Sequence, residues 1–211
     1  MKNKRRISSR KSALRYQHTS AAVFRATCLL LFHVGFVPPN GGGMEINMER
    51  EVILCIRDMM KQSRLKKMNE FIQHGNTTCL SHTVAVVYCA LSIAEKFHIK
   101  IDKRTLVRGG ILHDYFLYDW HDGRNERKIH GFTHPAYALR NADKDFNLND
   151  KERDIIKKHM FPLTVIPPAC KEAWLVCLAD KICACYETGK KNAYPSILRM
   201  ILREKRYIEK D

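Results

Sequence analysis

The sequence predicts an all-α fold, an irregular bundle of about six or seven helices. Two observations predict it. Apolar residues recur at three- and four-residue spacing through most of the chain after residue 49, and no segment shows the alternation of a convincing strand. With 211 residues, of which 45% are apolar and 28% charged, the chain is long enough for one globular domain with a buried core, whereas two full domains would be cramped.

Three helices are predicted in the first half of this body. Apolar residues over 49–72 follow helical spacing, which is typical of an amphipathic helix. The sequence HGNTTC at residues 74–79 then breaks the pattern. Residues 80–97 are apolar almost all round, as in a central buried helix. Asp102 is placed to cap the helix that ends at GGILHDY.

The remaining helices are predicted in the second half. Thr133, followed by Pro135 in the first turn, opens one helix. The stretch from Asn149 to Glu152 resembles a capping box in front of the next helix. The sequence KEAWLVCLADKICACYE starts a long apolar helix, and residues 195–210 form a last, basic amphipathic one.

Charge is concentrated at the two ends of the chain. The net charge is +15, yet residues 1–43 contain eight of the 37 basic residues and no acidic residue, and the segment from residue 190 onward is basic too. Too little positive charge remains on the body to indicate a nucleic-acid-binding surface. We therefore expect no specific nucleic acid partner. The sequence indicates no particular oligomeric state.

Residues 1–43 are expected to be a non-native or disordered basic extension, and the domain is expected over residues 44–211. The apolar run over 26–37 has twelve residues, too few to span a bilayer, so we expect no membrane anchor. A signal peptide is an alternative, although no A-x-A-like cleavage site follows the run. A further alternative is that Met44 is the true start and NGGG is a translated ribosome-binding site.

The eight cysteines match neither a metal-binding pattern nor a disulfide framework. Several lie inside apolar helical segments, where a free cysteine behaves as a small hydrophobic residue. Cys183 and Cys185 are not a CxxC pair, and no second pair stands at zinc-ribbon spacing. We therefore expect reduced thiols in a cytoplasmic protein.

Four histidines and two aspartates near helix ends or on apolar faces are candidate metal ligands. Asp180 is the most informative, because its neighbours on the helix are apolar and a buried charge must be paired, bound to metal or neutralised. Each residue alone has another explanation, such as a hydrogen-bonded core histidine, a helix-end histidine or an ion pair. One metal site accounts for all six at once. The six candidates are His82, His113, Asp114, His134, His159 and Asp180.

The order H…HD…D along a helical chain resembles the HD-domain superfamily of metal-dependent phosphohydrolases. The phrases LSHTVAV, GGILHDY, HGFTHP, KKHMFPLT and LADKICACYE are similar to those of bacterial members, over about residues 44–189. The resemblance implies an HD-domain fold and metal ligation by His82, His113, Asp114 and Asp180. His134 and His159 match the additional histidines of the binuclear branch of the superfamily.

This ligand set predicts two divalent transition-metal ions, such as iron or manganese. Two such ions lower the pKa of a shared water, and a bridging hydroxide then attacks a phosphoester in line. Asp114 and Lys181 are the predicted catalytic residues, and Lys181 either contacts the substrate phosphate or neutralises the site. One partition assigns the first ion to His82, His113 and Asp180 and the second to His134 and His159, with Asp114 as the bridge.

The segment after the HD pair is polar and carries cations. If it forms a lid over the metals, it offers Arg124, Lys128 and His130 to a substrate phosphate. If it is an exposed loop, its charges are solvated. His130 is also a rival of His134 as a ligand, and His134 is preferred because its neighbours place it at a helix start.

The leading prediction is a phosphohydrolase that acts on a small phosphorylated substrate, with a nucleotide as one candidate. Some members of the superfamily resemble this ligand set yet are di-iron oxygenases of polyol or phosphonate substrates, which is the alternative. A third interpretation is a non-catalytic sensor, and the intact ligand set argues against it. The sequence does not indicate the substrate, because specificity lies in loop shape and pocket walls.

Overall fold

The structure is a computed structural model that describes residues 50–61, 63–120, 130–189 and 193–194. Seven α-helices, α2 to α8, lie in these ranges together with one two-stranded hairpin, so the predicted all-α fold is confirmed. None of the described helices is long and apolar enough to cross a membrane. The predictions for the extension over 1–43, for Arg124 and Lys128, and for the basic helix over 195–210 lie outside the described residues.

The first part of the chain is more broken than its sequence predicts. Residues 49–72 are predicted as one amphipathic helical segment and 74–79 as a simple break. The structure instead has helix α2 (Arg50–Met60), the short helix α3 (Ser63–Lys66) and the 3-10 helix η1 (Lys67–Glu70), followed by strands β1 (Ile72–His74) and β2 (Thr77–Thr78).

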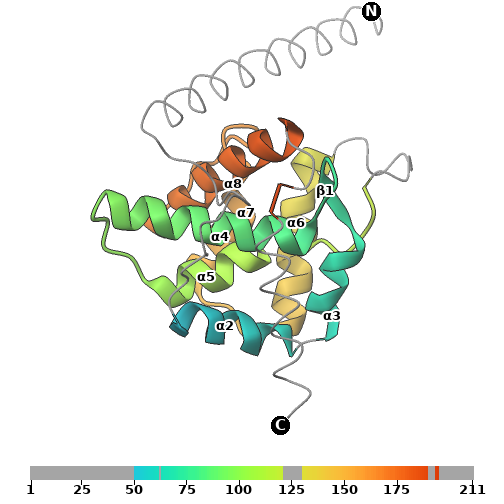
Figure 1. Cartoon of the computed structure of the whole chain (residues 1–211), viewed down its shortest axis with the longest axis horizontal. Coiled ribbons are helices and arrows are strands. Elements are labelled where there is room, and N and C mark those ends of the chain that lie inside the picture. Colours follow the sequence, from blue (N-terminus) through green and yellow to red (C-terminus); the bar gives the residue numbers. More distant parts are fainter. Residues whose placement is uncertain (1–49, 62, 121–129, 190–192, 195–211) are drawn as a thin grey trace, which may run out of the picture. The chain divides into compact units, whose positions relative to one another are not determined.

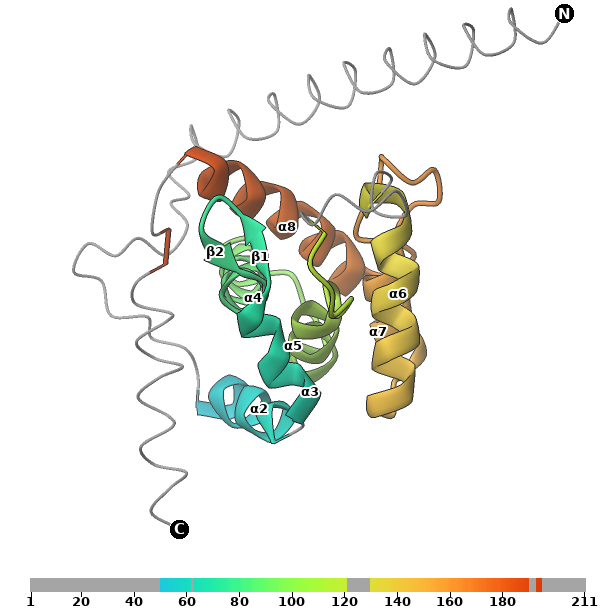
Figure 2. The ribbon, with the colours of Figure 1, turned by 90° about the vertical axis from the view of Figure 1, so that its right-hand side faces the viewer.

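The two strands form an antiparallel hairpin that the sequence did not predict. Gly75 turns the chain between them with a φ of 59°, a conformation that glycine adopts without steric cost. The expectation of no strand was wrong here, because two or three residues are too few to show the alternation on which a strand prediction rests. Figures 1 and 2 show that the hairpin lies against helices α4 and α8.

Two buried helices follow where they are predicted. Helix α4 (Cys79–Lys96) is buried along most of its length, and the Thr78 side chain accepts a hydrogen bond from the backbone N–H of Ser81 at its start. Helix α5 (Lys103–Leu112) begins after Asp102, whose side chain accepts from the backbone N–H of Thr105. The predicted cap at Asp102 is therefore present.

Helix α7 (Asp150–Lys158) begins with the predicted capping box. The Asn149 side chain accepts from the backbone N–H of Glu152, and the Glu152 side chain accepts from the backbone N–H of Asn149. The predicted long apolar helix is α8 (Lys171–Gly189). Local sequence signals therefore suffice to place both of these helices.

Helix α6 (His130–Asp145) begins earlier than predicted. Its first residue is His130 rather than a residue after Thr133, so Pro135 lies inside the helix and not in its first turn. Contacts at its start support the additional residues. The ring of His130 stacks on the ring of Trp120, and its Nδ1 lies 2.9 Å from the Tyr118 hydroxyl.

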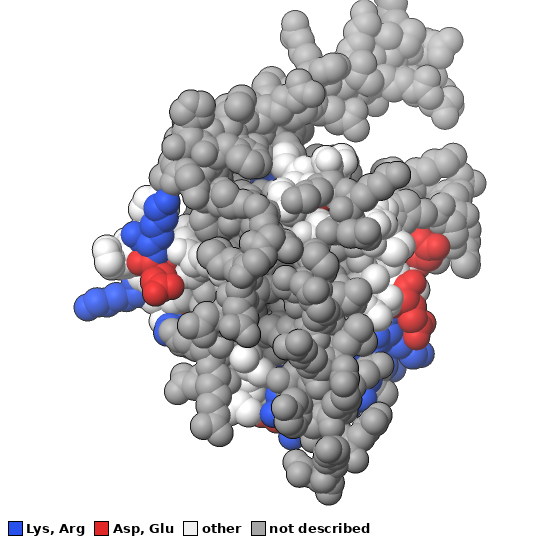
Figure 3. Space-filling view, in the orientation of Figure 1, with Lys and Arg blue, Asp and Glu red and all other residues white. Residues whose placement is uncertain are grey.

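Helices α4, α5, α7 and α8 pack against one another, and α6 packs on α7 (Figure 2). On the face that Figure 3 shows, the described basic and acidic side chains lie side by side near the edges. Opposite charges also pair within the described part of the chain, as in the Arg64–Asp145 ion pair at 2.8 Å. That the chain has no nucleic acid partner stays a prediction.

Gly110 allows α5 to approach α4 closely. A Cβ atom at this position would lie 2.7 Å from Cγ2 of Val87, whose β-branched side chain has little rotamer freedom. We expect Gly110→Ala to lower the free energy of unfolding by about 1–3 kcal/mol through overpacking. Urea denaturation measures this change.

Gly189→Ala is the control for this prediction, because no heavy atom of the described residues, apart from its chain neighbours and its own helix backbone, lies within 4 Å of a Cβ added at Gly189. The control should change the free energy of unfolding by less than about 1 kcal/mol, the usual effect of exchanging glycine and alanine in a helix. If both variants were equally stable, the close packing of α5 on α4 would be contradicted.

Candidate metal centre

The six predicted ligands meet in the interior, where α4, α5, α7 and α8 pack together. Each of the six residues is almost completely buried, and the most exposed, Asp180, has a relative exposure of 7%. His113 and His159 are the C-caps of α5 and α7. His82 lies on α4, Asp114 directly after His113, His134 on α6 and Asp180 on α8.

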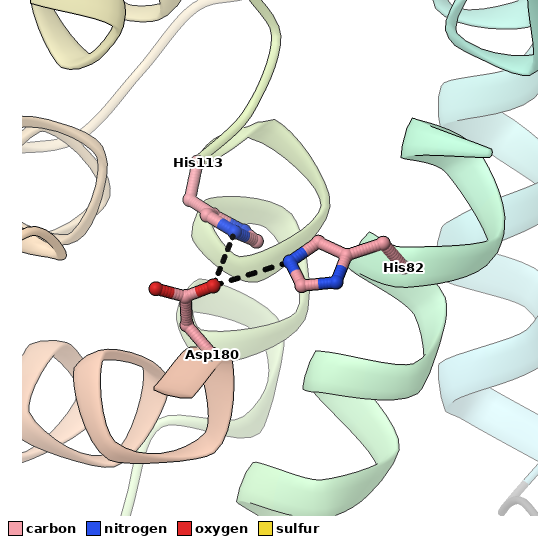
Figure 4. A group of neighbouring side chains, drawn as sticks. All are labelled: His82, His113 and Asp180. Atoms are coloured by element: carbon pink, nitrogen blue, oxygen red, sulfur yellow. Dashed lines mark hydrogen bonds and ion pairs between the residues drawn. The ribbon is translucent and has the colours of Figure 1, made fainter. Parts of the chain in front are cut away.

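One half of the cluster is formed by two histidines and Asp180. Oδ1 of Asp180 lies 3.1 Å from Nε2 of His82 and 3.7 Å from Nε2 of His113 (Figure 4). The three ligand atoms belong to helices distant in sequence, and His82 and Asp180 are 98 residues apart. The fold, and no local motif, brings these atoms together.

Asp114 faces both halves of the cluster. Its Oδ2 lies 3.4 Å from Nε2 of His113 and 3.7 Å from Nε2 of His82. Its Oδ1 lies 3.2 Å from Nε2 of His134 and 3.6 Å from Nε2 of His159. The carboxylate therefore presents one oxygen to each pair of histidines, as a ligand shared by two ions would.

All four imidazole rings are anchored through Nδ1, so that Nε2 faces the cluster. Nδ1 of His113, His134 and His159 lies 2.7–2.8 Å from a backbone carbonyl three or four residues earlier. Because a carbonyl only accepts hydrogen bonds, each of these Nδ1 atoms carries a proton. Nδ1 of His82 instead lies 2.8 Å from Oε1 of the buried Glu187 carboxylate. Such outer partners orient metal-binding imidazoles in proteins.

Two observations indicate that the cluster fits a cation. Nε2 of His134 lies 2.7 Å from Nε2 of His159, and Nδ1 of each ring already faces a carbonyl, so this contact is a hydrogen bond only when one of the two rings carries a second proton. Nε2 of His113 and Oδ1 of Asp114 are buried, and no described residue satisfies either with a hydrogen bond. Buried polar atoms without a hydrogen-bond partner are costly. A divalent cation would satisfy them, and imidazole and carboxylate ligands suit iron, manganese or zinc.

Among the described residues, two groups of three side chains have ligand atoms within 4.8 Å of one another. One group, His82, His113 and Asp180, is the set predicted for the first ion. The other consists of His113, Asp114 and His159. His113 belongs to both groups, and Asp114 Oδ1 also faces His134. The ligand atoms therefore form one continuous cluster with two overlapping halves.

The charges in the cluster depend on one another. Burial alone would raise the pKa of the Asp114 carboxyl, but the neighbouring His113 holds it well below its usual range. Burial alone would lower the pKa of His82, but the Glu187 carboxylate raises it well above its usual range. Burial and the neighbouring imidazoles lower the pKa of His159. A cation that bound here would replace the protons that balance the carboxylates.

The hairpin supplies a side chain that the sequence interpretation missed. Gln73, on β1, is buried and donates a hydrogen bond from Nε2 to Oδ2 of Asp114 at 2.5 Å. The Cys79 thiol donates to Oε1 of Gln73, which fixes the orientation of the amide. The next residue, His74, packs the edge of its ring against His82. The only sequence signal in this region was the break in helical pattern.

Lys181 lies beside the cluster and links two helices. Its Nζ is 3.6 Å from Oδ2 of Asp180 and donates to the backbone carbonyl of His159 at 2.7 Å. His130 is stacked on His134 with 4.5 Å between ring centroids, so it lies next to the cluster while His134 faces Asp114.

A helical fold around a buried set of imidazoles and carboxylates defines a metal-binding protein. The family model of the HD domain matches residues 79–185, a range that contains all six ligands. The chain belongs to the HD domain family, as the resemblance implied. HD domains bind divalent metals, and their superfamily is of the metal-dependent phosphohydrolase type. Comparisons with curated proteins and with solved structures give no significant match.

Proposed function

We propose that the chain is a phosphohydrolase that releases phosphate from a small phosphoester, such as a nucleotide. The observation that carries this proposal is the position of Asp114, whose two oxygens face two different pairs of histidines. This arrangement suits a pair of cations that share one carboxylate. Membership of the HD domain family supports the class of reaction.

Two divalent transition-metal ions, such as iron or manganese, would be held by the six buried side chains. When bound, they would supply an activated water at neutral pH and stabilise negative charge on the phosphoryl oxygens. In this proposal the first ion is held by His82, His113 and Asp180 and the second by His134 and His159, with Asp114 shared.

The chain's own cations would favour an anionic substrate. The ammonium group of Lys181 lies beside Asp180 and has 21% of its side chain exposed, so it places a positive charge where the cluster meets its surroundings. In this proposal Lys181 attracts the phosphate and offsets the charge of Asp180. Arg124, Lys128 and His130 are proposed to bind the same phosphate.

A cytoplasmic location is part of the same proposal. Six cysteines in the described part of the chain are free thiols, and four of these six are buried; the six are Cys55, Cys79, Cys89, Cys170, Cys177 and Cys183. Thiols of this kind are typical of proteins in a reducing compartment.

The test is phosphate release from a panel of nucleotides, sugar phosphates and aryl phosphoesters, with Mn²⁺ or Fe²⁺ added to the full chain. We expect turnover with at least one phosphoester, and we expect it to disappear on chelation of the metal. A chain that binds two ions yet releases no phosphate would contradict the proposal. Iron-dependent oxygen uptake with a polyol or phosphonate would then indicate an oxygenase.

A further inference from the structure

His82 is anchored differently from the other three histidines of the cluster. Its Nδ1 lies 2.8 Å from Oε1 and 3.0 Å from Oε2 of Glu187. The other three rings are anchored by backbone carbonyls of their own helices. Glu187 comes from α8, 105 residues away from His82 in the sequence. The cluster is therefore asymmetric among the described residues, with a carboxylate behind His82 and backbone carbonyls behind the other three rings.

The Glu187 carboxylate is enclosed by protein. Its side chain has a relative exposure of 0%, and so has the side chain of His82. The turn of the hairpin closes over the same part of α8, since a Cβ added to Gly75 would lie 2.9 Å from the backbone oxygen of Glu187. Because both side chains are buried, solvent screens the interaction between the carboxylate and the ring only weakly.

We propose that Glu187 makes the half of the centre that contains His82 the tighter of two unequal metal sites. This inference rests on the proposed function, because it requires that the cluster holds two ions. A carboxylate on Nδ1 fixes the imidazole and increases the basicity of Nε2 as a ligand. The half formed by His134 and His159 has only carbonyl anchors, so its ion binds more weakly.

Unequal sites have a consequence for activity. In this proposal the half that contains His82 would retain its ion, whereas the half formed by His134 and His159 would exchange its ion with free metal. The rate of phosphate release then follows the concentration of free metal near the dissociation constant of the weaker site. Glu187 is a positioning residue in this proposal, since it acts on the metal only through His82.

The test is a titration of the full chain with Co²⁺, in competition with a chelator, for the wild type and for Glu187→Gln. The amide oxygen of glutamine still accepts a hydrogen bond from the Nδ1–H group of His82. The substitution therefore removes the negative charge of the carboxylate and keeps the hydrogen bond that orients the ring. We expect two unequal dissociation constants in the wild type. In Glu187→Gln the tighter site should weaken by about 10–100-fold, the usual effect of losing an outer partner, while the weaker site stays the same.

Glu172→Gln is the matched control, because Glu172 lies on the same helix and is as buried as Glu187, each with a relative exposure of 1%. Its Oε1 accepts from the backbone N–H of Asp102 and from Nζ of Lys151, away from the cluster. This control should leave both metal affinities and the visible absorption of bound Co²⁺ unchanged. An unchanged control would show that the loss of a buried carboxylate elsewhere on α8 does not weaken metal binding.

Glu187→Asp keeps the charge and shortens the side chain, and we expect it to recover part of the lost affinity at the tighter site. It also replaces Glu187→Gln if that variant does not fold. Equal affinities at the two wild-type sites, or an unchanged tighter site in Glu187→Gln, would overturn this inference and leave the proposed function standing. A wild type that binds no Co²⁺ would overturn both.

Discussion

Asp114→Asn is expected to abolish phosphate release and to lower the affinity for both metal ions by more than about 100-fold, the upper end of what loss of an outer partner costs. Oδ1 and Oδ2 of Asp114 face different pairs of histidines, so this one substitution affects both halves of the centre. An asparagine is neutral and has only one acceptor oxygen, so it cannot replace a shared carboxylate. Metal content after dialysis and phosphate release from the active phosphoester measure the two effects.

Asp145→Asn is the control for this substitution. Asp145 is partly buried and accepts hydrogen bonds from Arg64 and Tyr115, outside the cluster. We expect this variant to keep its metal and its turnover even if it loses some stability. Circular dichroism checks that both variants fold. Turnover in Asp114→Asn near that of the wild type would refute the role of Asp114.

Chelation of the metal is expected to destabilise the fold. Metal binds the folded cluster but not the dispersed ligands of the unfolded chain, so metal at 100 times its dissociation constant adds about 2.7 kcal/mol to the free energy of unfolding. For a domain of this size the melting temperature should fall by roughly 5–10 °C when EDTA is added.

Thermal unfolding followed by circular dichroism measures this shift, and added Mn²⁺ should reverse it. Asp114→Asn serves as the internal control, because a chain that no longer binds metal should melt at the same temperature with and without EDTA. A wild-type melting temperature that did not respond to EDTA or to Mn²⁺ would show that the cluster is packed in the core without binding metal.

Local signals in the sequence predicted much of the fold. The caps at Asp102 and Asn149 were predictable because a capping side chain bonds to a backbone N–H three residues away, within one stretch of sequence. The long helix α8 was predictable from its continuous apolar composition. These features depend on neighbours in the chain and so need no knowledge of tertiary packing.

Two local details were not predictable in this way. Helix α6 already includes His130, whose ring stacks on Trp120 and contacts Tyr118, while the sequence pattern favoured the later start marked by Thr133 and Pro135. The hairpin was missed because its strands are very short. In both places contacts with residues elsewhere in the chain outweigh the local preference.

The sequence by itself determined which side chains form the cluster, since histidines and aspartates on apolar helices need partners wherever they are buried. Only the tertiary structure decided which atoms face one another. Gln73 and Asp114 are 41 residues apart, and His82 and Glu187 are 105 residues apart. No periodicity or spacing encodes such a pair, because its geometry arises only when helices and hairpin pack together and exclude water.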